Sequence, residues 1–221
     1  MGIFKKKEEK NSWFITIEGP EGAGKSSCAE VLVKFFESRN LPVICTREPG
    51  GTPLAEKLRE VVKNKPDAGE CIHPETELLL MEAARAQHVR EKIIPALQSG
   101  VSVICDRFYD STTAYQGGGR NIGKDEIRLF NTFASGGCDP DLTILMDLPP
   151  EAGFERVARR ASADAKDDRF EAENLEFHRK VRQEFLEIAR REPNRVKIVD
   201  AALSREEVAR QVEILINELV R

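Results

Sequence analysis

One octapeptide near the N-terminus has the residue types and spacing of a phosphate-binding loop. It fits the pattern G-x-x-x-x-G-K-[ST] and consists of Gly19, Pro20, Glu21, Gly22, Ala23, Gly24, Lys25 and Ser26. A short β-prone run, 13–18, precedes the loop, and apolar side chains recur at helical spacing over 27–37 after it. Backbone N–H groups of the loop and of the first helical turn, where Ser27 lies, then point at an anion that the helix dipole also attracts. The loop predicts a nucleoside triphosphate site, with Lys25 near the β- and γ-phosphates and the Ser26 hydroxyl on Mg²⁺.

Charged side chains stand at the ends of two further strand-like runs. Arg47 and Glu48 follow the first run, and Asp106 and Arg107 end the second. Ligands of an open parallel sheet bind beyond the carboxyl ends of its strands. We therefore expect Asp106 to hold Mg²⁺ opposite Ser26 and Arg107 to grip a phosphate with two parallel hydrogen bonds, while Arg47 and Glu48 face the same crevice. The alternative for the Asp106–Arg107 pair is a salt bridge that only stabilises a strand end.

An arginine and a glycine-rich segment are candidates for binding the organic part of a ligand. Arg85 lies in a helical pattern of apolar character, where a guanidinium needs a partner. An anionic substrate would be one partner, and Glu82 or Glu77 would be another. The segment 111–120, S-T-T-A-Y-Q-G-G-G-R, combines hydroxyls, an amide and an aromatic ring with three glycines that permit close backbone approach. It could contact a sugar or a base edge, or it could be a flexible connection between helices.

Cations gather late in the chain around a polar stretch. Arg159 and Arg160 lie near the end of a helical pattern, and Arg169 is the last residue of the stretch 161–169, which offers almost nothing to bury. We expect this stretch to be mobile. Cations on a closing lid would neutralise charge on a transferring phosphoryl group. The alternative is a solvated helix whose arginines are balanced by nearby acidic residues.

Strand-like and helical patterns alternate along the chain. The strand-like runs are 13–18, 42–46, 101–106, 142–148 and 196–200, and the helical patterns are 27–37, 54–62, 75–98, 124–134, 150–161, 174–191 and a last one that opens with a capping box at 204. Continuous apolar strands indicate burial on both faces, and alternation with helices favours right-handed parallel crossovers. We predict an α/β fold like that of P-loop NTPases, with a five-stranded parallel sheet flanked by helices. Residues 13–221 would form one domain with a lid near 156–171, after a disordered tail at 1–12.

Composition narrows the classes of function. A net charge of −4 and a pI near 5.6 do not favour a nucleic-acid-binding surface. No apolar run reaches membrane-spanning length, so no membrane association is expected. Five scattered cysteines without a C-x-x-C pair favour a reducing compartment, and we expect the protein to be cytoplasmic.

Together these segments resemble the thymidylate kinase family. The motifs that carry the resemblance are G-P-E-G-A-G-K-S, T-R-E-P-G-G-T, A-R-A-Q-H, D-R-F, S-T-T-A-Y-Q-G-G-G-R and D-R-F-E, which run from near the first strand to beyond the polar stretch. The resemblance implies a homodimeric enzyme that uses ATP and Mg²⁺ to phosphorylate dTMP, giving dTDP and ADP. A kinase for another monophosphate such as dUMP is the nearer alternative, and a non-catalytic nucleotide switch is the more distant one.

The resemblance also implies roles for residues of the acceptor site. It places Glu21 on the sugar of the monophosphate, Arg107 on its phosphate and Arg85 near its base. The tyrosine matching Tyr115 crowds the 2′ position and favours deoxyribose. The remaining pocket-lining matches are Thr112 and Gln116.

Two positions distinguish this chain within the family. Gly22 follows Glu21, so the loop offers no arginine, and the chain resembles the bacterial members with a basic lid. That resemblance makes Arg159, Arg160 and Arg169 the candidates for the transition-state cation. Met81 stands where many members have a phenylalanine that stacks on thymine, although a thioether can also pack on a base.

Overall fold

The computed structural model describes residues 11–64, 69–160 and 169–220, without the side chain of Arg160. The tail expected at 1–12 therefore lies largely outside the described residues. Residues 161–168, which make up most of the stretch 161–169 that is expected to be mobile, also lie outside the described residues.

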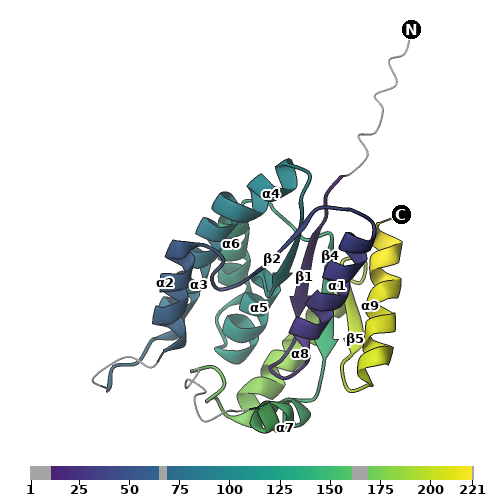
Figure 1. Ribbon diagram of the computed structural model, residues 1–221. Coiled ribbons are helices and arrows are strands. Elements are labelled where there is room, and N and C mark those ends of the chain that lie inside the picture. The colour runs from purple at the N-terminus through teal and green to yellow at the C-terminus, as the bar shows by residue number, and fades with distance from the viewer. Residues whose placement is uncertain (1–10, 65–68, 161–168, 221) are drawn as a thin grey trace.

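Five parallel strands form one sheet in the order β2-β3-β1-β4-β5 (Figure 1). They are β1 (Phe14–Glu18), β2 (Val43–Arg47), β3 (Ser102–Asp106), β4 (Leu142–Asp147) and β5 (Val196–Asp200). The central strand β1 pairs with β3 through Ile17 and Asp106 and with β4 through Thr16 and Thr143. This arrangement confirms the predicted five-stranded parallel sheet and brings the ends of β1, β2 and β3 together.

Helices connect every pair of consecutive strands. They are α1 (Lys25–Ser38), α2 (Pro53–Lys63), α3 (Pro74–His88), α4 (Ile94–Gln98), α5 (Tyr109–Thr112), α6 (Lys124–Ser135), α7 (Pro150–Arg160), α8 (Leu175–Arg191) and α9 (Arg205–Leu219). Side-chain caps begin several of them: Thr52 caps α2, Asn174 caps α8, and Ser204 forms the predicted capping box at α9. Two π-helical segments, η2 (Val89–Ile93) and η3 (Thr113–Gly119), continue α3 and α5.

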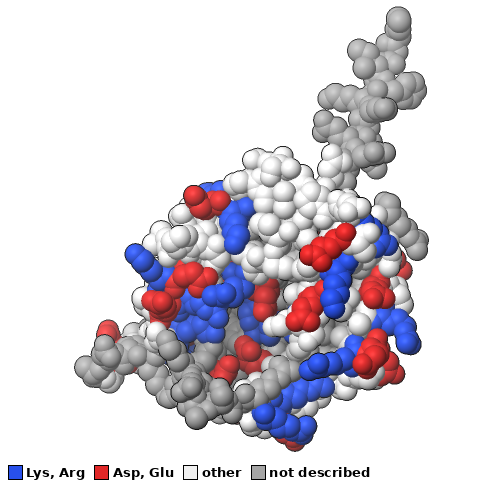
Figure 2. All heavy atoms as spheres, in the orientation of Figure 1, with Lys and Arg blue, Asp and Glu red and all other residues white. Residues whose placement is uncertain are grey.

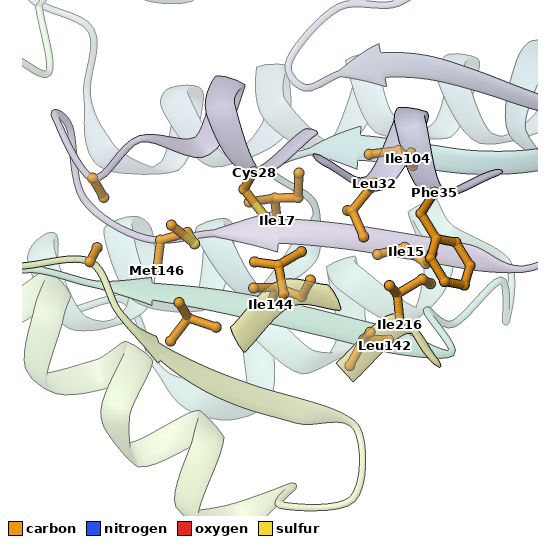
Figure 3. Close-up of a cluster of buried hydrophobic side chains, with 14 of the residues drawn as sticks. Ile15, Ile17, Cys28, Leu32, Phe35, Ile104, Leu142, Ile144, Met146 and Ile216 are labelled. Atoms are coloured by element: carbon orange, nitrogen blue, oxygen red, sulfur yellow. The ribbon is translucent and has the colours of Figure 1, made fainter. Parts of the chain in front are cut away.

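The three inner strands β1, β3 and β4 are buried on both faces, as their largely apolar runs predicted, whereas the edge strands β2 and β5 are partly exposed. Figure 3 shows Ile15 and Ile17 of β1 packed with Leu32 of α1 and Ile216 of α9. Phe14, which lies on the same strand one residue before Ile15, belongs instead to a second cluster with residues of η2 and β3. Alternate residues of β1 thus anchor helices on opposite faces, and this fixes the direction in which the loop after β1 leaves the sheet.

The glycine-rich segment 111–120 is helical, so its interpretation as a flexible connection is wrong. Residues 109–119 form α5 and η3, and η3 packs against α8. A Cβ at Gly119 would lie 2.5 Å from the Phe177 ring, and one at Gly118 would lie 2.8 Å from Cβ of Glu184. The glycines therefore permit close approach to a neighbouring helix, and this packing directs buried Tyr115 and Gln116 toward the site.

Candidate active site

One cavity at the carboxyl ends of the strands collects most of the predicted site residues. On the face drawn in Figure 2, basic and acidic side chains gather together around a hollow. The cavity is lined by residues from the loop and from five other segments. Those predicted from sequence are Glu21, Lys25, Arg47, Glu48, Met81, Arg85, Asp106, Arg107, Thr112, Tyr115 and Gln116. Residues predicted to bind phosphate and residues predicted to bind a nucleoside thus line the same cavity.

The phosphate-binding loop holds its lysine with backbone carbonyl groups. Nζ of Lys25 donates to the carbonyl oxygens of Pro20 at 3.0 Å and Gly19 at 3.3 Å. The side chain is 8% exposed, and burial, followed by the charge of Arg107, lowers its pKa. The nearest carboxylate oxygen of Glu21 is 4.0 Å away. Among the described residues, Lys25 has only neutral partners at hydrogen-bond distance, and it can exchange them for phosphate oxygens.

Helix α7 lies directly on the loop backbone. Gly22 has a φ of 74°, and a Cβ there would lie 2.5 Å from the carbonyl oxygen of Gly153 in α7. A Cβ at Gly153 would likewise lie 2.5 Å from the carbonyl oxygen of Glu21. Position 22 therefore lacks an arginine for a steric reason, because α7 occupies the space that any side chain would need.

Arg107 links the phosphate-binding loop to the segment that follows β3. Its Nη2 donates to Oε1 of Glu21 at 2.6 Å, and its Nη1 donates to the Gly19 carbonyl at 3.0 Å and to Oγ of Ser111 at 3.2 Å. Its backbone has a φ of 69°, which is uncommon for a residue with a side chain and is typical of functional sites. Burial alone would raise the pKa of Glu21, but the charges of Lys25 and Arg107 outweigh it and hold that pKa well below its ordinary value.

Glu18 is a site residue that the sequence did not reveal. It ends β1, is fully buried and accepts hydrogen bonds from the Phe108 N–H at 2.7 Å, the Ser111 N–H at 3.2 Å and the Ser111 hydroxyl at 2.6 Å. Burial, reinforced by the charge of Asp110, raises its pKa to about 7. The only sequence signal was a carboxylate directly after an apolar strand and before the loop. Glu18 holds the turn from which Arg107 projects.

Asp106 and Ser26 offer oxygen ligands suited to Mg²⁺. Both side chains line a groove beside α1. Oδ1 of Asp106 is buried and has no hydrogen-bond partner among the described residues, which is costly unless a ligand or water satisfies it. Within the described ranges no three His, Cys, Asp or Glu side chains form a metal-binding group. One carboxylate and one hydroxyl fit Mg²⁺, which usually retains waters and binds substrate phosphates.

A buried ionic network fixes Arg85. Its Nε donates to Glu48 at 2.8 Å, and its Nη1 donates to Glu82 at 2.5 Å and Thr112 at 3.0 Å. Glu82, which the sequence suggested, is therefore a partner, and Glu48 is a second one. His88 also bonds to Glu48, at 2.9 Å, so it belongs to the same buried network. Arg85 reaches the cavity already neutralised and oriented.

A second buried network surrounds Glu77, near the start of α3. Glu77 accepts hydrogen bonds from Gln116, Arg120 and Arg169. Arg169 also donates to the Val62 carbonyl at 3.1 Å, so this candidate lid cation is bonded between α2 and α3. The next residue, Phe170, lines the cavity and packs edge-on against Tyr115.

The other candidate cations differ in how closely they approach the loop. Arg159 is 76% exposed and pairs with Glu155, while the side chain of Arg160 lies outside the description. Arg156, which was not assigned to the site, donates to the Ala201 carbonyl at 2.9 Å and reaches the Gly22 carbonyl at 3.5 Å. Its only sequence signal was the four-residue spacing from Arg160. Arg47 lines the cavity but is largely exposed and pairs with Glu56.

Comparisons with known proteins agree with this geometry. The thymidylate kinase family model matches residues 17–212. The thymidylate kinase of Pseudomonas putida (strain GB-1) is 48% identical over 94% of this chain and 96% of its own length. That of Thermomicrobium roseum is 47% identical over 95% of this chain and 97% of its own length. In the described part of the chain no helix has the length and apolar character needed to span a bilayer. The chain belongs to the thymidylate kinase family.

Proposed function

We propose that this chain transfers the γ-phosphoryl group of ATP to the 5′-phosphate of dTMP, giving dTDP and ADP. Family membership supports the proposal. The observation that carries it is the single cavity lined both by the loop cation Lys25 and by the nucleoside-type residues Arg85, Tyr115 and Gln116. A nucleotide switch has no use for the second group of residues.

The cations at the phosphate end would do most of the catalysis. Phosphoryl transfer needs positioning and charge neutralisation and no covalent intermediate. We assign Lys25 to the β- and γ-phosphates of ATP and Arg107 to the acceptor phosphate. Glu21 holds Arg107 at 2.6 Å and stays ionised, so the guanidinium has a fixed position before the substrate binds. The backbone N–H groups from Gly19 to Ser27 would complete the ATP site.

Ser26 and Asp106 would hold the Mg²⁺ that accompanies ATP. The buried Oδ1 of Asp106, which lacks a partner among the described residues, supports this assignment. When bound, the ion would neutralise charge on the phosphates. The two side chains, one from α1 and one from β3, would contribute oxygen ligands.

We assign the remaining cation to the lid expected at 156–171. The glycine contact at position 22 supports a cation from outside the loop. Arg159 and Arg160 lie at the end of α7, which packs on the loop backbone. Arg169 is less suited to the role because Glu77 and the Val62 carbonyl already bind its guanidinium.

We also propose that the protein is a homodimer. The resemblance implies one, and exposed apolar side chains support it. Leu129 and Phe133 of α6 are 66% and 75% exposed and lie four residues apart, so they share one helix face. Helix α3, which packs against α6, adds exposed Leu79.

A cytoplasmic location completes the proposal. All five cysteines lie in the described part of the chain and are free thiols. Free thiols are typical of proteins in a reducing compartment.

One assay separates the proposed activity from its alternatives. ADP release from ATP would be measured with dTMP, dUMP, dCMP, dGMP and without an acceptor. We expect the highest kcat/KM with dTMP and very little ATP consumption without an acceptor. Preference for dUMP would overturn the assigned acceptor, and ATP consumption independent of any monophosphate would overturn the kinase assignment.

A further inference from the structure

Glu77 is a buried carboxylate whose hydrogen-bonding capacity is fully used. Its side chain is 0% exposed. Oε1 accepts from Nε2 of Gln116 at 2.7 Å and from Nε of Arg120 at 3.1 Å. Oε2 accepts from Nη2 of Arg120 at 3.1 Å and from Nη2 of Arg169 at 2.6 Å. These four bonds saturate a carboxylate, which offers about four acceptor positions.

Two guanidinium groups hold Glu77 in place. Arg120 binds it through two parallel N–H groups and also pairs with Glu173 at 2.6 Å. Arg169 is itself held by the Val62 carbonyl. An ionised carboxylate can only accept hydrogen bonds, so the group that Gln116 presents to it must be its NH₂.

The orientation of the Gln116 amide follows from this contact. Gln116 is 1% exposed, and it lines the cavity that also contains Arg85 and Met81. Because Nε2 is bonded to Glu77, the carbonyl Oε1 is the end of the amide that remains for a ligand in the cavity. Without Glu77 the amide could present either end, since the two orientations have nearly the same shape.

We propose that Glu77 is a positioning residue that sets the base selectivity of the acceptor site by fixing the Gln116 amide. The proposal rests on the proposed kinase function. Thymine and uracil present an N3–H donor beside the O4 acceptor, whereas cytosine presents the N3 acceptor beside an N4 amino donor. An acceptor at Gln116 and the donor-only guanidinium of Arg85 match the first edge and oppose the second.

The test measures kcat/KM for dTMP, dUMP and dCMP in the Glu77→Asp variant. Aspartate keeps the charge for both arginines but withdraws the acceptor by one methylene from Gln116. We expect the dTMP-to-dCMP ratio to fall by about tenfold or more, because the amide can then turn its NH₂ toward cytosine N3. The dTMP-to-dUMP ratio should stay within about twofold, since both bases have the same N3–H edge.

A matched variant and a double mutant separate this role from a general structural one. Glu173→Gln removes the other carboxylate of Arg120 without touching Gln116, and we expect its dTMP-to-dCMP ratio to equal that of the wild type. Gln116→Leu removes the amide, so adding Glu77→Asp to it should change the ratio no further. If Glu77→Asp does not fold, Arg120→Lys loosens Glu77 from the same side and should lower the ratio in the same direction.

The outcomes distinguish this inference from the proposed function. Wild-type protein that fails to phosphorylate dTMP would overturn the function itself. Active Glu77→Asp protein with an unchanged dTMP-to-dCMP ratio would overturn only the role of Glu77. Equal losses for dTMP and dCMP would also overturn it, because a disordered pocket lowers both rates without changing their ratio.

Discussion

The end of the cavity proposed for phosphate and the end proposed for the nucleoside hold their cations in different ways. At the phosphate end, Lys25 donates to two backbone carbonyl groups, and Arg107 has the partly exposed Glu21 as its carboxylate partner. At the nucleoside end, Arg85 lies between two buried carboxylates, and Glu77 receives two arginines. A cation whose partners are neutral or replaceable remains available for phosphate. Buried carboxylates instead neutralise a cation and fix the orientation of its side chain. Removing a cation should therefore cost activity at one end, and removing a carboxylate should cost stability at the other.

Lys25→Ala should have the largest effect on turnover. We expect kcat to fall about 10³-fold because a preorganised charge at the phosphates is lost. The melting temperature should change little, since burial already disfavours the charged form of Lys25. A steady-state assay and thermal denaturation would check both parts, with Lys180→Ala on the exposed side of α8 as the control. Full activity in Lys25→Ala would break the comparison at the phosphate end.

The arginines assigned to the lid should affect two different properties, turnover and dTMP binding. Replacing Arg159 and Arg160 together should lower kcat strongly while dTMP affinity is kept, and adding the Arg169 replacement should also weaken dTMP binding because Glu77 loses a partner. Separate replacements sharpen this expectation. The double variant Arg159→Ala/Arg160→Ala should lose about 10³-fold in kcat, as for a transition-state arginine. Arg169→Ala should instead raise KM for dTMP and lower the melting temperature, because Glu77 loses a partner. If Arg169→Ala lowered kcat strongly and the replacement of Arg159 and Arg160 did not, Arg169 would be the transition-state cation.

Glu48→Ala should destabilise the protein more than any replacement at the phosphate end. It leaves Arg85 without one carboxylate and His88 without its acceptor, both buried. Breaking a buried ion pair costs about 3–5 kcal/mol of unfolding free energy, measurable by urea denaturation. Asp125→Ala removes the exposed partner of Arg128 and should cost less than about 1 kcal/mol. Equal losses in the two variants would contradict the distinction.

Glu18 joins the two ends and should give stability a pH dependence of unusual sign. Its pKa rises on folding from 4.5 to about 7, so the folded state holds the proton more tightly than the unfolded state. Its contribution to stability is complete below about pH 4.5 and is lost as pH rises through 7. The loss amounts to ~3 kcal/mol for this fully buried group.

The Glu18→Gln variant isolates that contribution. Urea denaturation of both proteins between pH 5 and pH 8 would show unfolding free energy declining less steeply in the variant. The altered bond to the Ser111 hydroxyl should add a pH-independent difference on top of this change in slope. Parallel curves over the whole range would show that Glu18 does not titrate there.

The sequence predicted the sheet because its strands carry their own signal. The runs around Ile15, Ile104 and Ile144 are continuously apolar, and the observed strands agree with them to within about two residues. The helical pattern 75–98 is continuous in space, but the π-helical turn at η2 within it was not predicted. That turn depends on backbone hydrogen bonds, which leave no periodicity of their own.

Site residues with local signals were easier to find than those defined by tertiary contacts. The phosphate-binding loop is contiguous, and Glu82 lies one helical turn from its partner Arg85. By contrast, Arg156 meets Gly22 across 134 residues, and Glu18 meets Ser111 across 93. Neither pairing is encoded in spacing, because the packing of α7 and α5 on the loop creates both.

Because Gly22 and Gly153 are in contact, the substitutions that each position can accept during evolution depend on the other position. A side chain at either position would meet a backbone oxygen of the opposite segment at 2.5 Å. An arginine cannot enter the loop by one substitution while α7 keeps its place, and moving α7 would also break the bond from Arg156 to Gly22. A lineage that carries this glycine pair is therefore confined to cations from outside the loop until both segments change together.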